Sequence, residues 1–538
     1  MFQTHFSSSS KILMLNTINF KYSLLIKDDT SLMHYKIKRV IYKATSDKTL
    51  KYTEYTNRIM RRLINDMLKQ IHSFFEKCLQ KRIQSTQFKS MITIVMQKSD
   101  KKNYFNMKAY KSIVLLDMLS KILKFIIFKH LQNIIEACNL ILNIQMRTCK
   151  HRLTDITLQF ITKKIHIVWS DTRKRVISLL SLNKESAFNN VAHSRLLHDM
   201  KKRRVFRLLL EFVKNFLRNR RITITINDYM TMKRSMNVDI SQDSLLSSIL
   251  YLFYNVNLLE AYDNIRLRIS FTNFINNVNI LTYKKFMKCN CRVLDEIYDK
   301  CEQWSKTYDI KFSKTKHELI HFMRIFKWFN MNVDVKLMKH QINLKLNIRV
   351  LKVQLNFKLK WVTYMHHVEA KLVIKQKIMQ TIIEFTWNSS MTTSKQIYFA
   401  MTRFLLSHEV IIWYTLQRVK SHWKNLNIKL KSMQERVLQQ IINVYCVTLT
   451  KTLQMKINTT LINIHLQKLI QRSIINMNSW KSDEVIEMIM RWICNDLTSK
   501  RDWKSKLCKT FLQLKQKWMK ETFEQIKMNQ NHFYTVTF

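Results

Sequence analysis

The side chains that could hold a metal ion are few and unfavourably spaced. Cys289, Cys291 and Cys301 offer three thiols, but no second cysteine pair or histidine pair at zinc-site spacing accompanies them. His366 and His367 are adjacent, so on a helix or strand their imidazoles point to different sides and do not readily share one ion. We therefore interpret the three cysteines as ordinary thiols and the histidine pair as exposed.

Two basic clusters could bind the phosphates of a nucleic acid. Lys201-Lys202-Arg203-Arg204 and Arg218-Asn219-Arg220-Arg221 concentrate cationic side chains, and Phe206 and Phe216 nearby are candidate stacking partners for bases. The alternative is that both clusters are solvated helix faces with no partner. The sequence leaves this choice open.

The composition is unusual because 538 residues include no glycine and no proline. Average usage of roughly 7% and 5% predicts about 38 and about 27, since turns and helix ends draw on both residues. Alanine is also rare, whereas Lys, Asn, Ile and Leu are abundant, as sustained C-to-T and G-to-A changes in the coding DNA would leave them. The same changes convert Glu codons into Lys codons, so the formal net charge of +55 is weak evidence for an acidic partner.

The elements that must position any site are short strands and amphipathic helices. Apolar spacing of three and four predicts helices over residues 59–80 and 110–140, and the pattern is helical from about residue 370 onward. The predicted strands are Ile92–Met96, Val176–Leu182, Arg221–Ile226, Val278–Thr282 and Glu318–Phe322. The fold class is therefore expected to be α+β, followed by a mostly α-helical C-terminal region.

The stretch from Ser244 to Leu259 is the best candidate for a membrane segment. Its length and its polar interruptions favour a buried helix instead. No secretory apolar segment is recognisable at the N-terminus, and the nine cysteines are scattered. We expect an intracellular, reducing location and no membrane partner.

The same stretch carries a resemblance to a known family. Ser244 to Asn255, preceded by Asp239-Ile240-Ser241-Gln242-Asp243, resembles the "GIPQGSPLSPILYLFYN" motif of reverse transcriptases from fungal non-LTR (LINE-like) retrotransposons. Asp239 and Asp243 stand where the family has Gly, and Ser241 stands where it has Pro. Single C-to-T or G-to-A steps reach each of these departures, and repeat-induced point mutation in fungi makes such changes.

Further segments resemble other motifs of the family, in its order and over roughly residues 90 to 480. The upstream segments are Lys108–Ile113 ("KAYRPI"), Gln145–Arg147 with His151–Thr154 ("QMG...RST") and Leu182–Val191 ("LDVKGAFDNV"). The downstream segments are Asn273–Leu281 ("GFVDDVNIL"), Lys316 with Glu318–Phe322 (the fourth palm motif), Leu351–Asn356 ("LGVQLD"), and Arg403-Phe404 with Val410–Trp413 ("RPA...YGSTIW").

The resemblance implies a right-hand polymerase. Its expected parts are an N-terminal segment over 1–80, fingers and palm over 81–330, a thumb over 331–400 and a helical connection over 401–538. The implied activity is RNA-directed DNA synthesis during retrotransposition, in the nucleus, with an RNA template, a DNA primer and Mg²⁺ but no small-molecule cofactor. The motifs imply these template- and nucleotide-binding residues: Lys111, Arg152, Phe188, Gln242 and Lys316.

The resemblance also places the family's three metal-binding carboxylates at Asn183, Asn276 and Asn277, where this chain has amides. Three negative charges are therefore missing opposite two dications, and a loss of even about 6 kcal/mol lowers a rate by roughly four decades. Glu185 would share the face of Asn183 on a strand, but its carboxylate would be misplaced by several ångström. We expect this copy to bind no metal and to be catalytically inactive. The alternative function is a non-catalytic basic protein that binds RNA or DNA.

The loss of glycine bears on folding as well. The motifs put a residue with a Cβ at five of the family's Gly positions, which are Asp239, Asp243, Asn273, Lys284 and Lys352. A left-handed backbone at such a residue costs roughly 1–2 kcal/mol, and Asn and Asp tolerate it better than Lys does. A few tens of such positions would exceed a typical stability of about 5–15 kcal/mol. We expect the fold to be weakened.

Overall fold

The computed structural model contains two compact units. The first contains residues up to Ile161 and residues 165–371, and the second contains Thr162–Lys164 and residues from Leu372 onward. The described residues are 34–43, 57–98, 103–106, 109–138, 140–141, 145–148, 152–170, 175–226, 229–236, 240, 244–263, 269–323, 335–337, 340–342, 344–385, 391–414, 420–442, 453 and 457–479.

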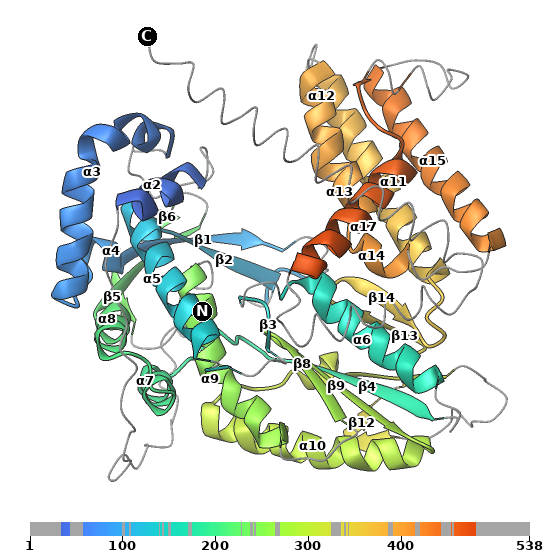
Figure 1. Ribbon diagram of the computed structural model, residues 1–538, viewed down its shortest axis with the longest axis horizontal. Helices are drawn as coiled ribbons and strands as arrows, with labels where there is room; N and C mark the ends of the chain where they lie inside the picture. Colours follow the sequence, from blue (N-terminus) through green and yellow to red (C-terminus); the bar gives the residue numbers. More distant parts are fainter. Residues whose placement is uncertain are drawn as a thin grey trace. The chain divides into compact units, whose positions relative to one another are not determined.

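A five-stranded sheet in the order β10-β4-β9-β8-β3 forms the centre of the first unit. Its strands are β3 (Gln145–Met146), β4 (Val176–Asn183), β8 (Ile269–Phe274), β9 (Asn277–Lys284) and β10 (Glu318–Phe322). All neighbours are antiparallel except β3, which runs parallel to β8. The first five residues of β4 are all buried, and four of these five are apolar. Helix α10 (Met287–Tyr308) packs on β4 and β9 (Figure 1).

A second sheet of the same unit has the order β2-β1-β5-β6, with β7 also paired to β5. Its strands are β1 (Ser90–Gln97), β2 (Tyr110–Leu115), β5 (Arg220–Ile226), β6 (Tyr229–Met230) and β7 (Arg234–Met236). The structure therefore corrects the helix predicted over residues 110–140. Its first six residues are strand β2, which pairs antiparallel with β1, and helix α5 begins only at Met118. Long-range pairing with β1, which local apolar spacing does not reveal, decides this segment.

Helices cover these sheets and share one hydrophobic core with the central sheet. They are α2 (His34–Lys43), α3 (Asn57–Gln80), α4 (Thr86–Lys89), α5 (Met118–Ala137), α7 (His193–Lys202), α8 (Arg207–Leu217) and α9 (Leu245–Asp263). Residues 249–256 of α9 are all buried, so the prediction of a buried helix here is confirmed. Among the described residues, no helix is long and apolar enough to cross a membrane.

The first unit also contains a 3₁₀ turn (Lys314–Lys316) and two small hairpins. The hairpin strands are β11 (Val335–Leu337), β12 (His340–Ile342), β13 (Asn347–Val350) and β14 (Val353–Asn356). Helix α6 (Thr154–Ser170) crosses the boundary between the units, as does α11 (Val362–Phe385).

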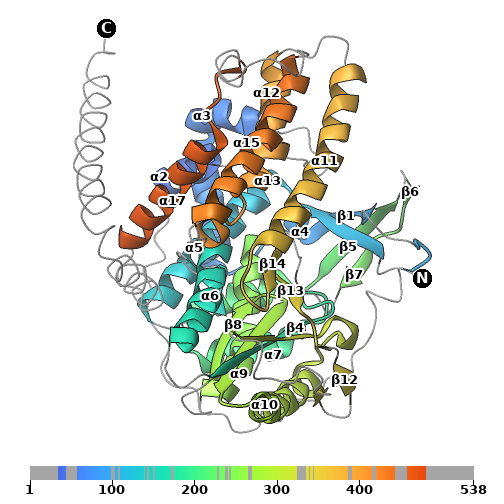
Figure 2. The ribbon, with the colours of Figure 1, turned by 90° about the vertical axis from the view of Figure 1, so that its right-hand side faces the viewer.

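Among its described residues, the regular secondary structure of the second unit is all helical. It contains α12 (Met391–Tyr398), a π-helical turn (Phe399–Arg403), α13 (Phe404–Ser407), α14 (Val410–Trp413), α15 (Lys420–Ile442) and α17 (Ile462–Ser479). Helix α15 packs against α12 and α17 (Figure 2). Gln434 links these elements, because its Nε2 donates to the Tyr398 hydroxyl at 3.1 Å and its Oε1 accepts from the Ile462 N–H at 2.8 Å. The expected α+β class with a helical C-terminal region is confirmed.

Thirteen described residues with a Cβ have positive φ. Lys352, at φ 72°, is one of them, as the motif comparison predicts. The same expectation is wrong for Asn273 and Lys284, because these residues lie in the extended strands β8 and β9 and do not have positive φ. Asp239 and Asp243 lie outside the described residues.

Candidate functional site

The three asparagines at the expected ligand positions come together at one end of the central sheet. Asn183 ends β4 and Asn277 begins β9, and the two are direct partners across this antiparallel pair. Asn183 Nδ2 donates a hydrogen bond of 2.7 Å to Asn277 Oδ1. Asn276 lies in the turn between β8 and β9, where its backbone carbonyl accepts from the Lys184 N–H at 2.8 Å. Strand pairing thus joins residues that are 94 positions apart in the chain.

The turn that carries Asn276 is strained at the residue before it. Ile275 has φ 56°, although it is β-branched and only 5% exposed. This region is a clear outlier for a β-branched residue and costs roughly 1–2 kcal/mol. The family motif "GFVDDVNIL" also has a β-branched residue here, so the strain does not arise from a lost glycine. Strain that the surrounding structure maintains is common at functional sites.

A buried lysine lies directly behind the turn, and sequence reasoning missed it. Lys184 Nζ donates hydrogen bonds to Asn255 Oδ1 and, at 3.3 Å, to the Ile275 carbonyl. It lies 5.7 Å from the Tyr251 ring centre and 5.3 Å from that of Trp304. Burial lowers the pKa of this amine to about 7. The signal was available in the sequence, since Lys184 comes directly after the last residue of β4, at a position where the motif has Val.

The donor set at the three asparagines does not suit Mg²⁺. This ion prefers carboxylates and water, whereas amides carry no charge. Asn277 Oδ1 already accepts from Asn183, and the buried Oδ1 of Asn276 has no hydrogen-bond partner among the described residues. In the part of the chain that the structure describes, no three His, Cys, Asp or Glu side chains group closely enough to hold a metal.

Glu185 does not occupy the strand position that would let its carboxylate substitute. Strand β4 ends at Asn183, and the backbone at Glu185 bends away from the strand. Its N–H donates to the Lys311 carbonyl at 2.8 Å. The expected alternation that would put Glu185 and Asn183 on one strand face is therefore wrong.

Two of the expected nucleotide-binding residues, Lys316 and Arg152, lie near strands of the central sheet. Lys316 is exposed and lies three residues after Ser313, whose N–H donates to the Asn183 carbonyl at 2.8 Å. Arg152 Nη1 donates to the Gln145 carbonyl at 3.4 Å, and Gln145 belongs to the edge strand β3.

The other three residues of that set are not gathered there. Lys111 is exposed on β2 of the second sheet. Phe188 is buried, and its ring centre lies 5.0 Å from that of Tyr251, so it is part of the core in this conformation. Gln242 lies outside the described residues.

Both basic clusters are partly internal, which neither interpretation from the sequence anticipated. Arg203 Nη2 pairs with Glu260 Oε1 at 2.6 Å. Arg220 is 1% exposed and lies over the ring of Phe216, which is itself 2% exposed. Phe216 is therefore not available to stack on a base, and only part of each cluster faces solvent.

The cysteine and histidine groups lie elsewhere. All three cysteines are on α10, where Cys301 is buried, whereas Cys289 and Cys291 are half-buried and point to different sides. His366 is exposed as expected, but His367 is half-buried.

No protein-family model and no curated protein matches this chain. A function for the site therefore depends on the motif resemblance and on the geometry of its residues.

Proposed function

We propose that this chain is a reverse transcriptase of a non-LTR (LINE-like) retrotransposon in a copy that has lost nucleotidyl transfer. The observation that carries the proposal is the pairing of Asn183 with Asn277 beside the strained turn at Asn276. The motifs that suggest ligand carboxylates at these positions are far apart in sequence, yet strand register makes them neighbours. A shared metal site requires this convergence.

The backbone supports the proposal at other motif positions. Arg147 has φ 68°, Ser186 has φ 46° and Lys352 has φ 72°. They stand at the glycines of "QMG", "LDVKGAFDNV" and "LGVQLD" respectively. Glycine adopts positive φ without a Cβ clash, so a family that needs these conformations has a reason to use it there.

In this proposal the central sheet with α9 and α10 is the palm, and the sheet of β1, β2 and β5 belongs to the fingers. An active relative would hold two Mg²⁺ ions on its carboxylates, and these would activate the primer hydroxyl and stabilise the leaving phosphate. In this chain three neutral amides replace the three expected anions. These amides have the shape of the carboxylates but not their charge. They therefore do not hold the two Mg²⁺ ions, and nucleotidyl transfer is lost.

Primer extension tests both halves of the proposal. The native chain and Asn183→Asp/Asn276→Asp/Asn277→Asp are compared on a primed RNA template with Mg²⁺. We expect no extension by the native chain and measurable extension by the triple variant. The matched control is Asn276→Asp/Asn277→Asp, which keeps Asn183. We expect it to extend the primer at least roughly 100-fold more slowly than the triple variant, because one carboxylate ligand is missing.

Magnesium binding provides a readout that does not depend on activity. Three carboxylates at this site repel one another without the ion, so Mg²⁺ should raise the melting temperature of the triple variant and not that of the native chain. Extension by the native chain would refute the loss of activity. A triple variant that Mg²⁺ stabilises but that extends no primer would refute the polymerase assignment.

A further inference from the structure

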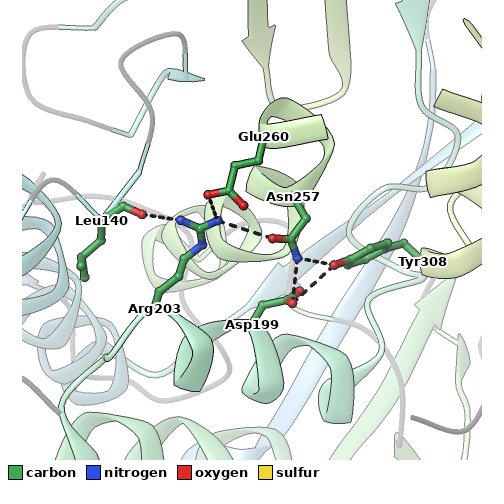
Figure 3. Close-up of polar contacts among 6 residues, drawn as sticks. All are labelled: Leu140, Asp199, Arg203, Asn257, Glu260 and Tyr308. Atoms are coloured by element: carbon green, nitrogen blue, oxygen red, sulfur yellow. Dashed lines mark hydrogen bonds and ion pairs between the residues drawn. The ribbon is translucent and has the colours of Figure 1, made fainter. Parts of the chain in front are cut away.

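A second polar site lies among α7, α9 and α10 (Figure 3). It is a cavity of about 410 Å³, and its lining includes none of Asn183, Asn276 and Asn277. The residues that line it are Arg195, His198, Asp199, Lys202, Asn257, Glu260 and Tyr308. The function proposed above uses none of these side chains.

Asp199 is the central group of this cavity. It is 2% exposed, and its Oδ1 accepts hydrogen bonds from Asn257 Nδ2 at 2.8 Å and from the Tyr308 hydroxyl at 3.3 Å. Its Oδ2 is buried and has no hydrogen-bond partner among the described residues. A buried oxygen without a partner is destabilising, so a ligand that shares a proton with it would remove that cost.

Cationic side chains accompany this carboxyl group on one face of α7. Arg195, His198, Asp199 and Lys202 follow the spacing of three and four that puts side chains on the same side of a helix. The Arg195 guanidinium lies 5.1 Å from the Tyr308 ring centre, and its buried Nε has no partner among the described residues.

Glu260 does not offset these cations, because it is already paired. Its Oε1 lies 2.6 Å from Arg203 Nη2, and Arg203 Nη1 also donates to the Leu140 carbonyl at 2.8 Å. Two cations, Arg195 and Lys202, therefore line the same cavity as the Asp199 carboxyl group, whose Oδ2 has no donor among the described residues. This combination suits an anion that carries a proton of its own.

We propose that the cavity binds a hydrogenphosphate group, with Asp199 Oδ2 sharing one proton with a phosphate oxygen and with Arg195 and Lys202 balancing the anionic charge. The ligand is either inorganic phosphate or a phosphate monoester. The cavity is larger than a phosphate group alone requires, so it also has room for an organic substituent.

The proton shared between Asp199 and the ligand would let the site distinguish inorganic phosphate from sulfate. Burial raises the pKa of Asp199 to about 7, whereas hydrogen bonds from Asn257 and the nearby Arg195 and Arg203 oppose this rise. His198 has a lowered pKa because of burial and of the neighbouring cations, so it is neutral at about pH 8. At about pH 8 the ionised carboxylate thus needs a proton from the ligand. Inorganic phosphate still has one, whereas sulfate and phosphate monoesters do not.

Titration calorimetry of the full chain at about pH 8 and constant ionic strength tests the proposal. Inorganic phosphate should bind at least about tenfold more tightly than sulfate or a nucleoside monophosphate, since the latter two present only unprotonated oxygens to a carboxylate. At about pH 6 the monophosphate should gain affinity, because Asp199 and the ligand then have a proton to share. The two pH values thus separate the two sources of phosphate.

Asp199→Asn is the decisive variant. Its Oδ1 can still accept from Asn257 and Tyr308, while its Nδ2 donates to any oxyanion, so sulfate should bind within about twofold of phosphate. This gain in sulfate binding cannot come from misfolding. Lys202→Gln should weaken both anions, whereas Lys201→Gln should leave both unchanged, because Lys201 does not line the cavity. Equal affinity of the native chain for phosphate and sulfate, no binding of either anion, or no gain of sulfate binding in Asp199→Asn would overturn the proposal.

Discussion

At the scale of single residues, an amide in place of a carboxylate changes the charge of a site and almost nothing of its shape. Asn183 and Asn277 show the consequence, because their side chains form a 2.7 Å hydrogen bond where two carboxylates would repel each other. Under the function proposed above, the same amides that cannot hold Mg²⁺ stabilise the sheet without it.

Lys184 gives a residue-scale prediction about pH. Burial lowers the pKa of its amine from 10.5 to about 7 in the folded chain. Between these values the unfolded chain binds more protons than the folded chain does, so stability rises with pH, by at most about 1.4 kcal/mol per unit. Below about pH 7 the full cost of burying the charge is present. Lys184→Met should remove this part of the pH dependence and stabilise the chain by about 2 kcal/mol at about pH 6, after the loss of its hydrogen bonds to Asn255 and Ile275.

Urea unfolding at several pH values measures this effect. Lys124, whose pKa burial also lowers to about 7, contributes equally to both chains, so only the difference between native and variant is diagnostic. Lys111→Met removes an exposed charge and should leave the pH dependence unchanged. Parallel pH profiles of the native chain and the Lys184→Met variant would show that folding does not lower the pKa of Lys184.

At the scale of elements, the β13–β14 hairpin shows what the absence of glycine does to a tight turn. Val350 pairs with Val353, so the loop has two residues, and both Leu351 (φ 47°) and Lys352 (φ 72°) have positive φ. Such a loop is a type I′ turn, which favours Asn-Gly. Leu351→Asn/Lys352→Gly should therefore raise the free energy of unfolding by about 1–2 kcal/mol, measured by urea denaturation. Lys360→Gly, at an exposed residue without positive φ, should instead lower it by about 0.5–1 kcal/mol.

The helices and strands differ in how far their local sequence determines them. All five predicted strands are present, because each is a compact β-rich run in a sheet. Strand β2 was mistaken for helix because its partner β1 fixes its conformation from outside the segment. The motif resemblance predicted the residues of the candidate site, and the register of β4 with β9 supplied their contact. Asp199 and Lys184 were missed because burial, which decides their chemistry, is a property of packing.

At the scale of the whole molecule, the formal charge of +55 does not by itself indicate a nucleic-acid partner. Arg220 lies in the core, and Arg203 is paired with Glu260. Part of the cationic content is thus internal, and the alternative of a dedicated nucleic-acid-binding protein receives less support than the charge alone suggests. Non-specific binding to RNA would still weaken steeply with salt.

Backbone strain is the other property of the whole molecule, and it yields a cumulative prediction. Thirteen described residues with a Cβ adopt positive φ, and ten of them are neither Asn nor Asp, the two types that tolerate this region best. At roughly 1–2 kcal/mol each, these ten cost about 10–20 kcal/mol, which is as large as or larger than a typical stability of about 5–15 kcal/mol. Restoring glycine at Arg147, Ser186 and Lys352 removes three of these costs within the first unit, although each glycine also makes the unfolded chain more flexible. We expect a net gain of about 2–3 kcal/mol in the free energy of unfolding.

The midpoint of urea unfolding measures this gain, and its slope shows whether cooperativity changes. The matched control introduces three glycines at exposed lysines of the same unit that lack positive φ, which are Lys285, Lys314 and Lys360. These substitutions add flexibility to the unfolded chain without relieving strain, so they should lower the midpoint. A restored chain no more stable than the control would mean that the fold has already adapted to its missing glycines by relaxing elsewhere, and the positive φ values would then cost far less than steric clash predicts.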